Sequence, residues 1–152
     1  MEPYFLRPVA GLAICLLLLG GVVVFAQDAE PAAVAAAPSP EQVLAGKRVW
    51  ADAACYNCHG NNGQGGNSKD FPHGPSLRTS TLDAATTLEI IACGIPGTLM
   101  AAWAKGAYTE RPCFGETGPV PDETRVLGVY DEQQLADLMA YINATFHKGE
   151  MQ

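Results

Sequence analysis

One run of five residues constrains this chain more than any other feature of its sequence: Cys55-Tyr56-Asn57-Cys58-His59. Two thiols three positions apart beside an imidazole are compatible with a redox dithiol, a zinc site, a structural disulfide or a covalently attached prosthetic group. A thioredoxin-like dithiol needs a β-α-β context, and a zinc site needs a second close Cys/His pair. The sequence shows neither of these, and a disulfide between Cys55 and Cys58 would leave His59 without a role.

The same spacing is the attachment signature of a c-type haem. Cys55 and Cys58 would add to the two vinyl groups of the porphyrin as thioethers, and His59 would bind the iron. We therefore predict one covalently attached haem c, with His59 as an iron ligand.

Composition and charge limit the other functions that this chain could have. Its 152 residues suit one ordinary domain, and its net charge is −7. A nucleic-acid-binding protein needs a basic face to displace counterions from phosphates, so we predict no nucleic-acid partner. The sequence also contains no phosphate-binding glycine motif, which removes support for nucleotide-driven chemistry.

The amino-terminal segment is predicted to export the chain. Residues 9–25 are uniformly apolar, Arg7 precedes them, and Val24-Phe25-Ala26 offers small or compact residues at a cleavage site. Residues 1–26 are therefore either a signal peptide or an N-terminal membrane anchor, because 17 apolar residues just reach the length that spans a bilayer. Both alternatives predict a periplasmic protein, soluble or anchored, that meets the membrane only through residues 9–25.

The rest of the chain divides into a linker and one domain. Residues 27–39 are rich in Ala and Pro and are predicted to be an extended linker. Residues 40–148 contain three segments with helical periodicity and N-terminal caps, beginning at Pro40, Leu82 and Glu132. No segment alternates as a strand, so we predict an all-α domain with a small core. Its remaining parts are predicted as loops and one short turn: residues 61–75, 99–104 and 105–129.

Three further segments resemble those of class I mono-haem cytochromes c. They are Gly46-Lys47-Arg48-Val49-Trp50, Gly74-Pro75-Ser76-Leu77 and Gly94-Ile95-Pro96-Gly97-Thr98-Leu99-Met100. The resemblance covers residues 40–148 and implies the cytochrome c fold, a small helical domain wrapped around one haem c. It departs from the family pattern at Ala101, where proline is usual, and in two additional cysteines.

The resemblance also implies roles for single residues. Gly46 would let the first helix cross closely over Tyr141 in the last helix. The carbonyl of Pro75 would accept the Nδ1–H of His59 and so orient the ring. Five aromatic residues are expected to wall the haem, because an apolar shell excludes water: Trp50, Tyr56, Trp103, Tyr108 and Phe114.

Met100 is the predicted second iron ligand. It lies 41 residues after His59 in a Gly/Pro-rich loop, and the resemblance places it in the family's sixth-ligand position. A thioether is a soft ligand that favours ferrous iron and suits electron transfer. The alternatives are ligation by His73 or His147, or an open sixth position.

Cys93 and Cys113 are predicted to form a disulfide. Cys55 and Cys58 are used by the haem and Cys15 lies in the leader, so these two remain in an oxidising compartment. The bridge would close a loop around Met100. It either restrains this ligand loop, where Pro is missing at position 101, or serves as a general staple of an irregular segment.

These features predict a one-electron carrier in a periplasmic respiratory or dehydrogenase-linked chain, and not an enzyme. Its partners would be a redox protein donor and acceptor that dock transiently. One alternative is a cytochrome subunit stably bound to a periplasmic dehydrogenase or oxidase, with residues 105–129 as the contact surface. Another is a haem protein that reacts with gases or peroxide, if Met100 dissociates readily.

Overall fold

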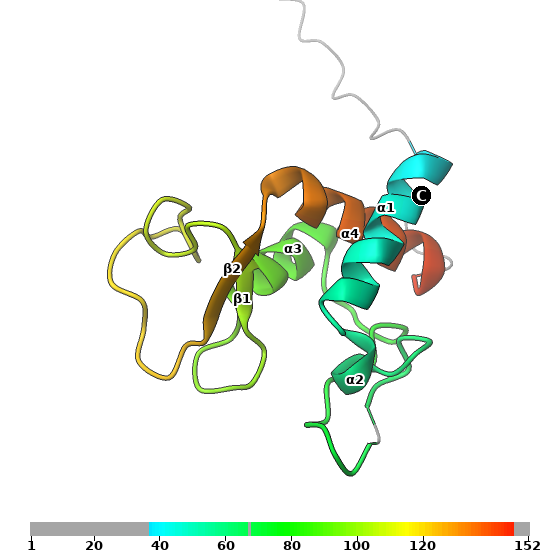
Figure 1. Ribbon diagram of the computed structural model, residues 1–152, viewed down its shortest axis with the longest axis horizontal. Helices are drawn as coiled ribbons and strands as arrows, with labels where there is room; N and C mark the ends of the chain where they lie inside the picture. The colour runs from blue at the N-terminus through cyan, green and yellow to red at the C-terminus, as the bar shows by residue number, and fades with distance from the viewer. Residues whose placement is uncertain (1–36, 67, 148–152) are drawn as a thin grey trace, which may run out of the picture. The chain divides into compact units, whose positions relative to one another are not determined.

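A computed structural model describes residues 37–66 and 68–147 (Figure 1). Among these residues no helix is both long and apolar enough to cross a lipid bilayer. The predicted leader or anchor, residues 1–26, and residues 27–36 of the predicted linker lie outside the described residues. The described elements are α1 (Pro40–Asp52), α2 (Tyr56–His59), α3 (Ala84–Cys93), β1 (Ala102–Ala104), β2 (Val126–Tyr130) and α4 (Glu132–Thr145).

The three longer helices begin at the capping residues of the sequence. Ser39 and Asp131 each accept a backbone N–H from the third helical residue and complete a capping box with a glutamine, as the capping rules predict. Helix α3 begins two residues later than predicted, because Asp83 caps it by accepting the N–H of Thr86 at 2.7 Å. The Thr86 N–H also lowers the pKa of the Asp83 carboxyl below its ordinary value.

Helices α1 and α4 cross, and both contribute buried residues to the core (Figure 1). Gly46 lies at the crossing, where a Cβ would overlap the backbone carbonyl of Asp137 and lie 2.8 Å from the Cβ of Tyr141. The ring of Trp50 packs beside that of Tyr141, with centroids 6.0 Å apart. The close approach of Gly46 to the last helix near Tyr141 is therefore as the sequence predicts.

The expectation of an all-α domain was wrong in one place, because β1 and β2 form a two-stranded parallel sheet. The Ala102 N–H donates to the Arg125 carbonyl, and the Lys105 N–H donates to the Tyr130 carbonyl, each at 2.8 Å. Strand β1 replaces the predicted turn at 99–104. It has only three residues, and its partner lies more than twenty positions along the chain, so no local pattern reveals the pairing. The remaining elements of the described residues are helices, joined by long loops.

Candidate functional site

The Cys-x-x-Cys-His segment lies just beyond the end of α1. Ala54 takes a positive φ of 51° and turns the chain, and Cys55 is the N-cap of the one-turn helix α2. Residues three and four positions apart lie on one face of a helix, so Cys55, Cys58 and His59 project in the same direction. One turn of helix thus brings together the three side chains that the sequence motif singled out.

The thiols of Cys55 and Cys58 are unpaired and half-buried. Burial raises the pKa of the Cys55 thiol to about 12, with a smaller raising effect from Cys58. Reactive dithiols and zinc-binding cysteines work as thiolates in electropositive surroundings, which lower their pKa. The environment of Cys55 instead raises its pKa and keeps it a thiol, which argues against a reactive dithiol or a zinc site.

The imidazole of His59 is fixed by one hydrogen bond to the main chain. Its Nδ1 lies 2.9 Å from the carbonyl oxygen of Pro75. A carbonyl can only accept, so Nδ1 carries a proton, and in the neutral ring Nε2 then has its lone pair free for a metal. A backbone carbonyl at the far nitrogen is the usual support of a metal-binding histidine.

Two glycines let the loop that contains Pro75 approach the Cys-x-x-Cys-His turn. The Gly74 N–H donates to the Cys58 carbonyl at 2.8 Å, and the Gly66 N–H donates to the Gly74 carbonyl at 3.1 Å. A Cβ on Gly74 would lie 2.9 Å from the Nδ1 of His59, and one on Gly66 would overlap the Cys58 carbonyl. Only a residue without a side chain fits either position.

Aromatic rings from α1 and α4 back the His59 side chain. The Trp50 ring is 5% exposed, and its centroid lies 6.5 Å from that of His59 and 5.1 Å from that of Phe146. Trp50 was expected in this role, whereas Phe146 was not. Tyr56 and Phe114 were also expected to wall the haem, and both side chains are exposed to solvent in this structure.

Met100 lies in a tight loop between α3 and β1. The Ile95 N–H donates to the Met100 carbonyl at 3.0 Å, and the Met100 N–H donates to the hydroxyl of Thr98 at 3.1 Å. Its side chain is partly buried against the same core cluster that Cys55 borders. The loop therefore holds the thioether at the margin of the core, on a segment separate from α2.

The two rival histidines lie elsewhere. His73 is exposed in the loop two residues before Pro75, and the half-buried His147 follows the end of α4. Neither has a hydrogen-bond partner among the described residues comparable to the Pro75 carbonyl that holds His59.

Tyr130 is a site residue that sequence reasoning missed. It is 7% exposed and stacks on Trp103, with ring centroids 5.7 Å apart. It belongs to the core cluster against which Cys55 and Met100 pack. Burial raises the pKa of its hydroxyl above the ordinary value, and Asp52 and Cys55 raise it further. Its position directly before the capping Asp131, where a buried hydrophobic residue is common, was the one available signal.

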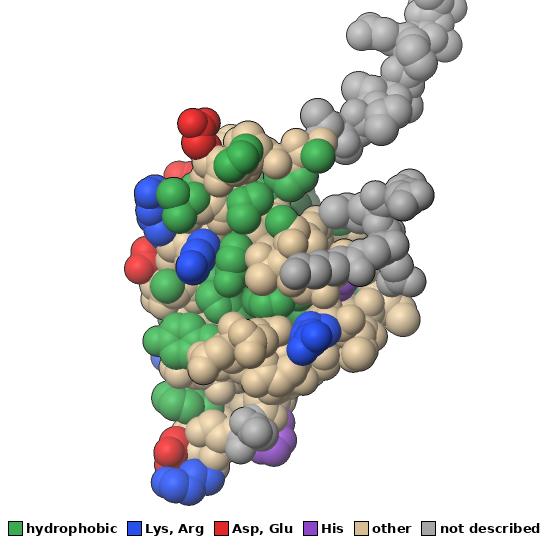
Figure 2. All heavy atoms as spheres, turned by 90° about the vertical axis from the view of Figure 1, so that its right-hand side faces the viewer, with side chains coloured by type: hydrophobic (Ala, Val, Ile, Leu, Met, Phe, Trp, Pro, Cys, Tyr) green, Lys and Arg blue, Asp and Glu red, His purple; other side chains and the backbone are tan. Residues whose placement is uncertain are grey.

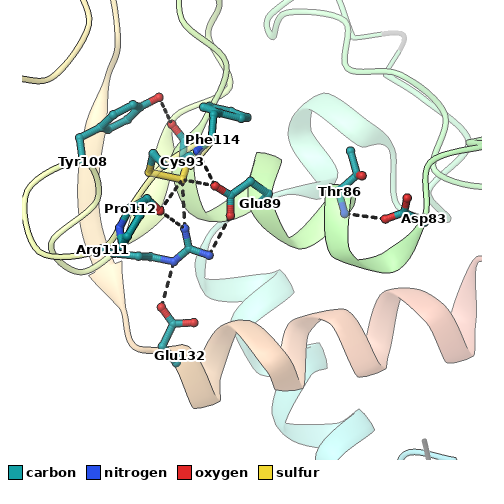
Figure 3. Close-up of polar contacts among 10 residues, drawn as sticks. Asp83, Thr86, Glu89, Cys93, Tyr108, Arg111, Pro112, Phe114 and Glu132 are labelled. Carbon is teal, nitrogen blue, oxygen red and sulfur yellow. Dashed lines mark hydrogen bonds and ion pairs between the residues drawn. A yellow bond between two sulfur atoms is a disulfide. The ribbon is translucent and has the colours of Figure 1, made fainter. Parts of the chain in front are cut away.

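A disulfide and an arginine tie the segment after β1 to the helices (Figure 3). The Sγ atoms of Cys93 and Cys113 lie 2.09 Å apart. The Arg111 guanidinium donates to Glu89 at 3.0 Å and to Glu132 at 2.9 Å, and so links α3 with α4. These carboxylates lie more than twenty positions from Arg111 along the chain, and no sequence pattern pointed to them.

Figure 2 shows hydrophobic side chains gathered on one face, with Lys or Arg side chains among them and further charged side chains along the margins. Several large hydrophobic residues in the described segments are more than a third exposed, including Leu99 at 68% and Leu82 at 48%. Large hydrophobic side chains that are exposed together often mark a surface that another group covers. The free thiols, the available Nε2 of His59 and this exposed apolar surface fit a bulky apolar group that carries a metal ion, such as haem.

A model of the cytochrome c family matches residues 43–146 of the chain. The protein belongs to the cytochrome c family. Its members are haem-binding electron-transfer proteins, so the cytochrome c fold and an electron-transfer role for this cytochrome follow from the match, as the sequence predicted.

No curated protein and no solved structure gives a significant match to this cytochrome. The family match begins inside α1, at residue 43, and covers α2, α3, α4, the Cys-x-x-Cys-His turn and the Met100 loop.

Proposed function

We propose that this cytochrome carries one covalently attached haem c of class I type and acts as a one-electron carrier in an exported respiratory or dehydrogenase-linked chain. The observation that carries the proposal is the hydrogen bond between Nδ1 of His59 and the Pro75 carbonyl. It leaves Nε2 of His59 available for the iron, close to two unpaired thiols. Cys55 and Cys58 would hold the porphyrin, and His59 and Met100 would bind the iron.

Each of these residues has a defined task. The bound haem supplies an iron that changes reversibly between the ferric and ferrous states. The Pro75 carbonyl keeps His59 in one tautomer and one orientation. The Met100 thioether favours the ferrous state and so raises the reduction potential. The rings of Trp50, Trp103 and Tyr130 exclude water.

The same ligand set argues against enzymatic activity at the metal. With His59 and Met100 both bound, no position on the iron is left for a substrate. The loop that carries Met100 is closed by hydrogen bonds from Ile95 and to Thr98, which oppose dissociation of the thioether.

Export to the periplasm is supported by two features. Residues 1–26 have the layout of a signal peptide or anchor. The pair Cys93 and Cys113 lies at disulfide distance, and disulfides persist in oxidising compartments. The donor and acceptor would be redox proteins that dock transiently on this acidic molecule.

Mass spectrometry of the denatured protein tests the covalent attachment. The native chain should carry the mass of one haem, and a Cys55→Ser/Cys58→Ser variant should carry none. A redox titration of the loaded protein should follow a one-electron Nernst curve. Haem that is released on denaturation, or more than one haem per chain, would contradict the proposal.

A further inference from the structure

Residues Cys113–Glu116 form an unusual turn with two central residues, which we call the Phe114 turn. The Cys113 N–H donates to the Glu116 carbonyl at 2.7 Å, and the Glu116 N–H donates to the Cys113 carbonyl at 3.1 Å. Both central residues have positive φ, 55° for Phe114 and 87° for Gly115. Positive φ at both central positions is the requirement of a type I′ turn.

Phenylalanine is a poor residue for the first central position of such a turn. Asn, Asp or Gly normally occupies it, because a bulky side chain is strained at positive φ. The Phe114 side chain is 54% exposed, so burial within this molecule does not offset the strain. Strained residues of this kind cluster at binding sites, and a large exposed aromatic ring is the side chain that most often anchors a protein interface.

A disulfide and a hydrogen bond to α3 hold the Phe114 turn in place (Figure 3). Cys113 is bonded to Cys93 at the end of α3, and the Phe114 N–H donates to a carboxylate oxygen of Glu89 at 2.6 Å. The same carboxylate pairs with Arg111, which also pairs with Glu132. A turn whose backbone is fixed in this way loses little main-chain freedom when a partner covers it.

The segment of the chain that contains the Phe114 turn is acidic. Residues 105–137 contain seven acids and three bases, a net −4, whereas residues 40–104 contain five acids and four bases, a net −1. One of the three bases, Arg111, is already paired with Glu89 and Glu132. Most of the negative charge of the described residues therefore lies in the part of the chain that presents Phe114.

We propose that the Phe114 turn anchors the docking of a positively charged redox protein whose electron-transfer face is apolar. The inference rests on the proposed electron-carrier function and names the surface that serves it. Cys93 connects this surface to the Met100 loop, because the loop begins at the next residue, Gly94. A partner seated on Phe114 therefore lies next to the segment that holds the iron ligand.

Stopped-flow electron transfer tests the proposal with a defined probe. The reduced, haem-loaded protein is mixed with an oxidised basic cytochrome c of higher potential, and separately with a small inorganic oxidant. Phe114→Ala should slow the reaction with the basic cytochrome about tenfold, as loss of an interface anchor does. Glu116→Gln should slow it about twofold and weaken its dependence on salt. Neither variant should change the rate with the small oxidant.

Phe71→Ala is the matched control, because Phe71 is also an exposed phenylalanine but lies in a different loop. An unchanged rate for Phe114→Ala with the basic cytochrome, an equal loss for Phe71→Ala, or a rate that does not fall with salt would overturn the proposal. A concentration-dependent dimer in sedimentation that Phe114→Ala abolishes would also overturn it, since the turn would then bind a second copy. Failure of the wild-type protein to reduce the small oxidant would instead refute the proposed carrier function.

Discussion

At the scale of single residues, the site depends on backbone atoms as well as on the side chains of the motif. His59 is oriented by a backbone carbonyl, that of Pro75, at 2.9 Å. That carbonyl reaches the ring because Gly74 leaves room for its loop beside Cys58 and His59. The orientation of the proposed iron ligand is therefore a property of the loop backbone as much as of the histidine.

Gly74→Ala should disturb this arrangement. Its Cβ would lie 2.8 Å from the Cys58 carbonyl oxygen and 2.9 Å from the Nδ1 of His59, so the loop must shift. We expect a loss of about 1–3 kcal/mol in the free energy of unfolding of the loaded protein, measured by denaturant titration. Gly118→Ala is the control, because a Cβ there meets nothing within 4 Å. Equal stability of the two variants would show that the loop is not held against His59.

At the scale of elements, the helices follow from local signals and the sheet does not. Capping residues and helical periodicity predicted α1 and α4 at their observed starts and α3 to within two residues. The sheet pairs a three-residue strand with residues far along the chain. In β2 the adjacent Val126 and Leu127 are both apolar and both exposed, so apolar and polar residues do not alternate along this strand. The contacts of Arg111 with Glu89 and Glu132 were missed for the same reason, because they are set by the fold and not by spacing.

The helix crossing gives the sharpest prediction at this scale. Gly46→Ala places a methyl group on the Asp137 carbonyl and must push α1 and α4 apart. We expect the free energy of unfolding to fall by about 3 kcal/mol, at the upper end for overpacking. Lys47→Ala, at an exposed neighbouring position, should change it by about 0.5 kcal/mol or less. A Gly46→Ala variant as stable as wild type would show that the helices do not cross at this residue.

The Cys93–Cys113 bridge stabilises the segment that follows the Met100 loop. It closes a loop of sequence separation 20, so Cys93→Ser/Cys113→Ser should lower the free energy of unfolding by about 3 kcal/mol. If the bridge also restrains Met100, imidazole should displace this ligand more readily in the double variant, as an optical titration of the ferric protein would show. Reduced stability with unchanged imidazole affinity would show that the bridge stabilises the segment but does not restrain Met100.

At the scale of the whole molecule, the described chain has a small core and much exposed apolar surface. The packed centre comes mainly from α1, α4 and the segment around β1. Large apolar residues such as Ile95, Leu99 and Val129 are at least 40% exposed. A bound haem would add the apolar volume that such a domain otherwise lacks, since small domains often depend on a cofactor for stability.

Removal of the haem should therefore destabilise the fold. In Cys55→Ser/Cys58→Ser, which has no means of covalent attachment, we expect a lower melting temperature and a smaller far-ultraviolet circular dichroism signal than in the loaded wild type. Tyr56→Ala, an exposed position between the two cysteines, is the control and should melt close to the wild type. A Cys55→Ser/Cys58→Ser variant that melts like the wild type would show that this chain folds without its cofactor.

The central claim is that His59 and Met100 both bind the iron of a c-type haem. The optical spectrum of the oxidised, loaded protein tests it most directly, because sulfur ligation of ferric haem produces a weak band at long wavelength. We predict that this band is present in the wild type and is lost in Met100→Ala, while the haem stays covalently attached. A wild-type protein that carries haem but lacks the band, or a Met100→Ala variant that retains it, would contradict the claim.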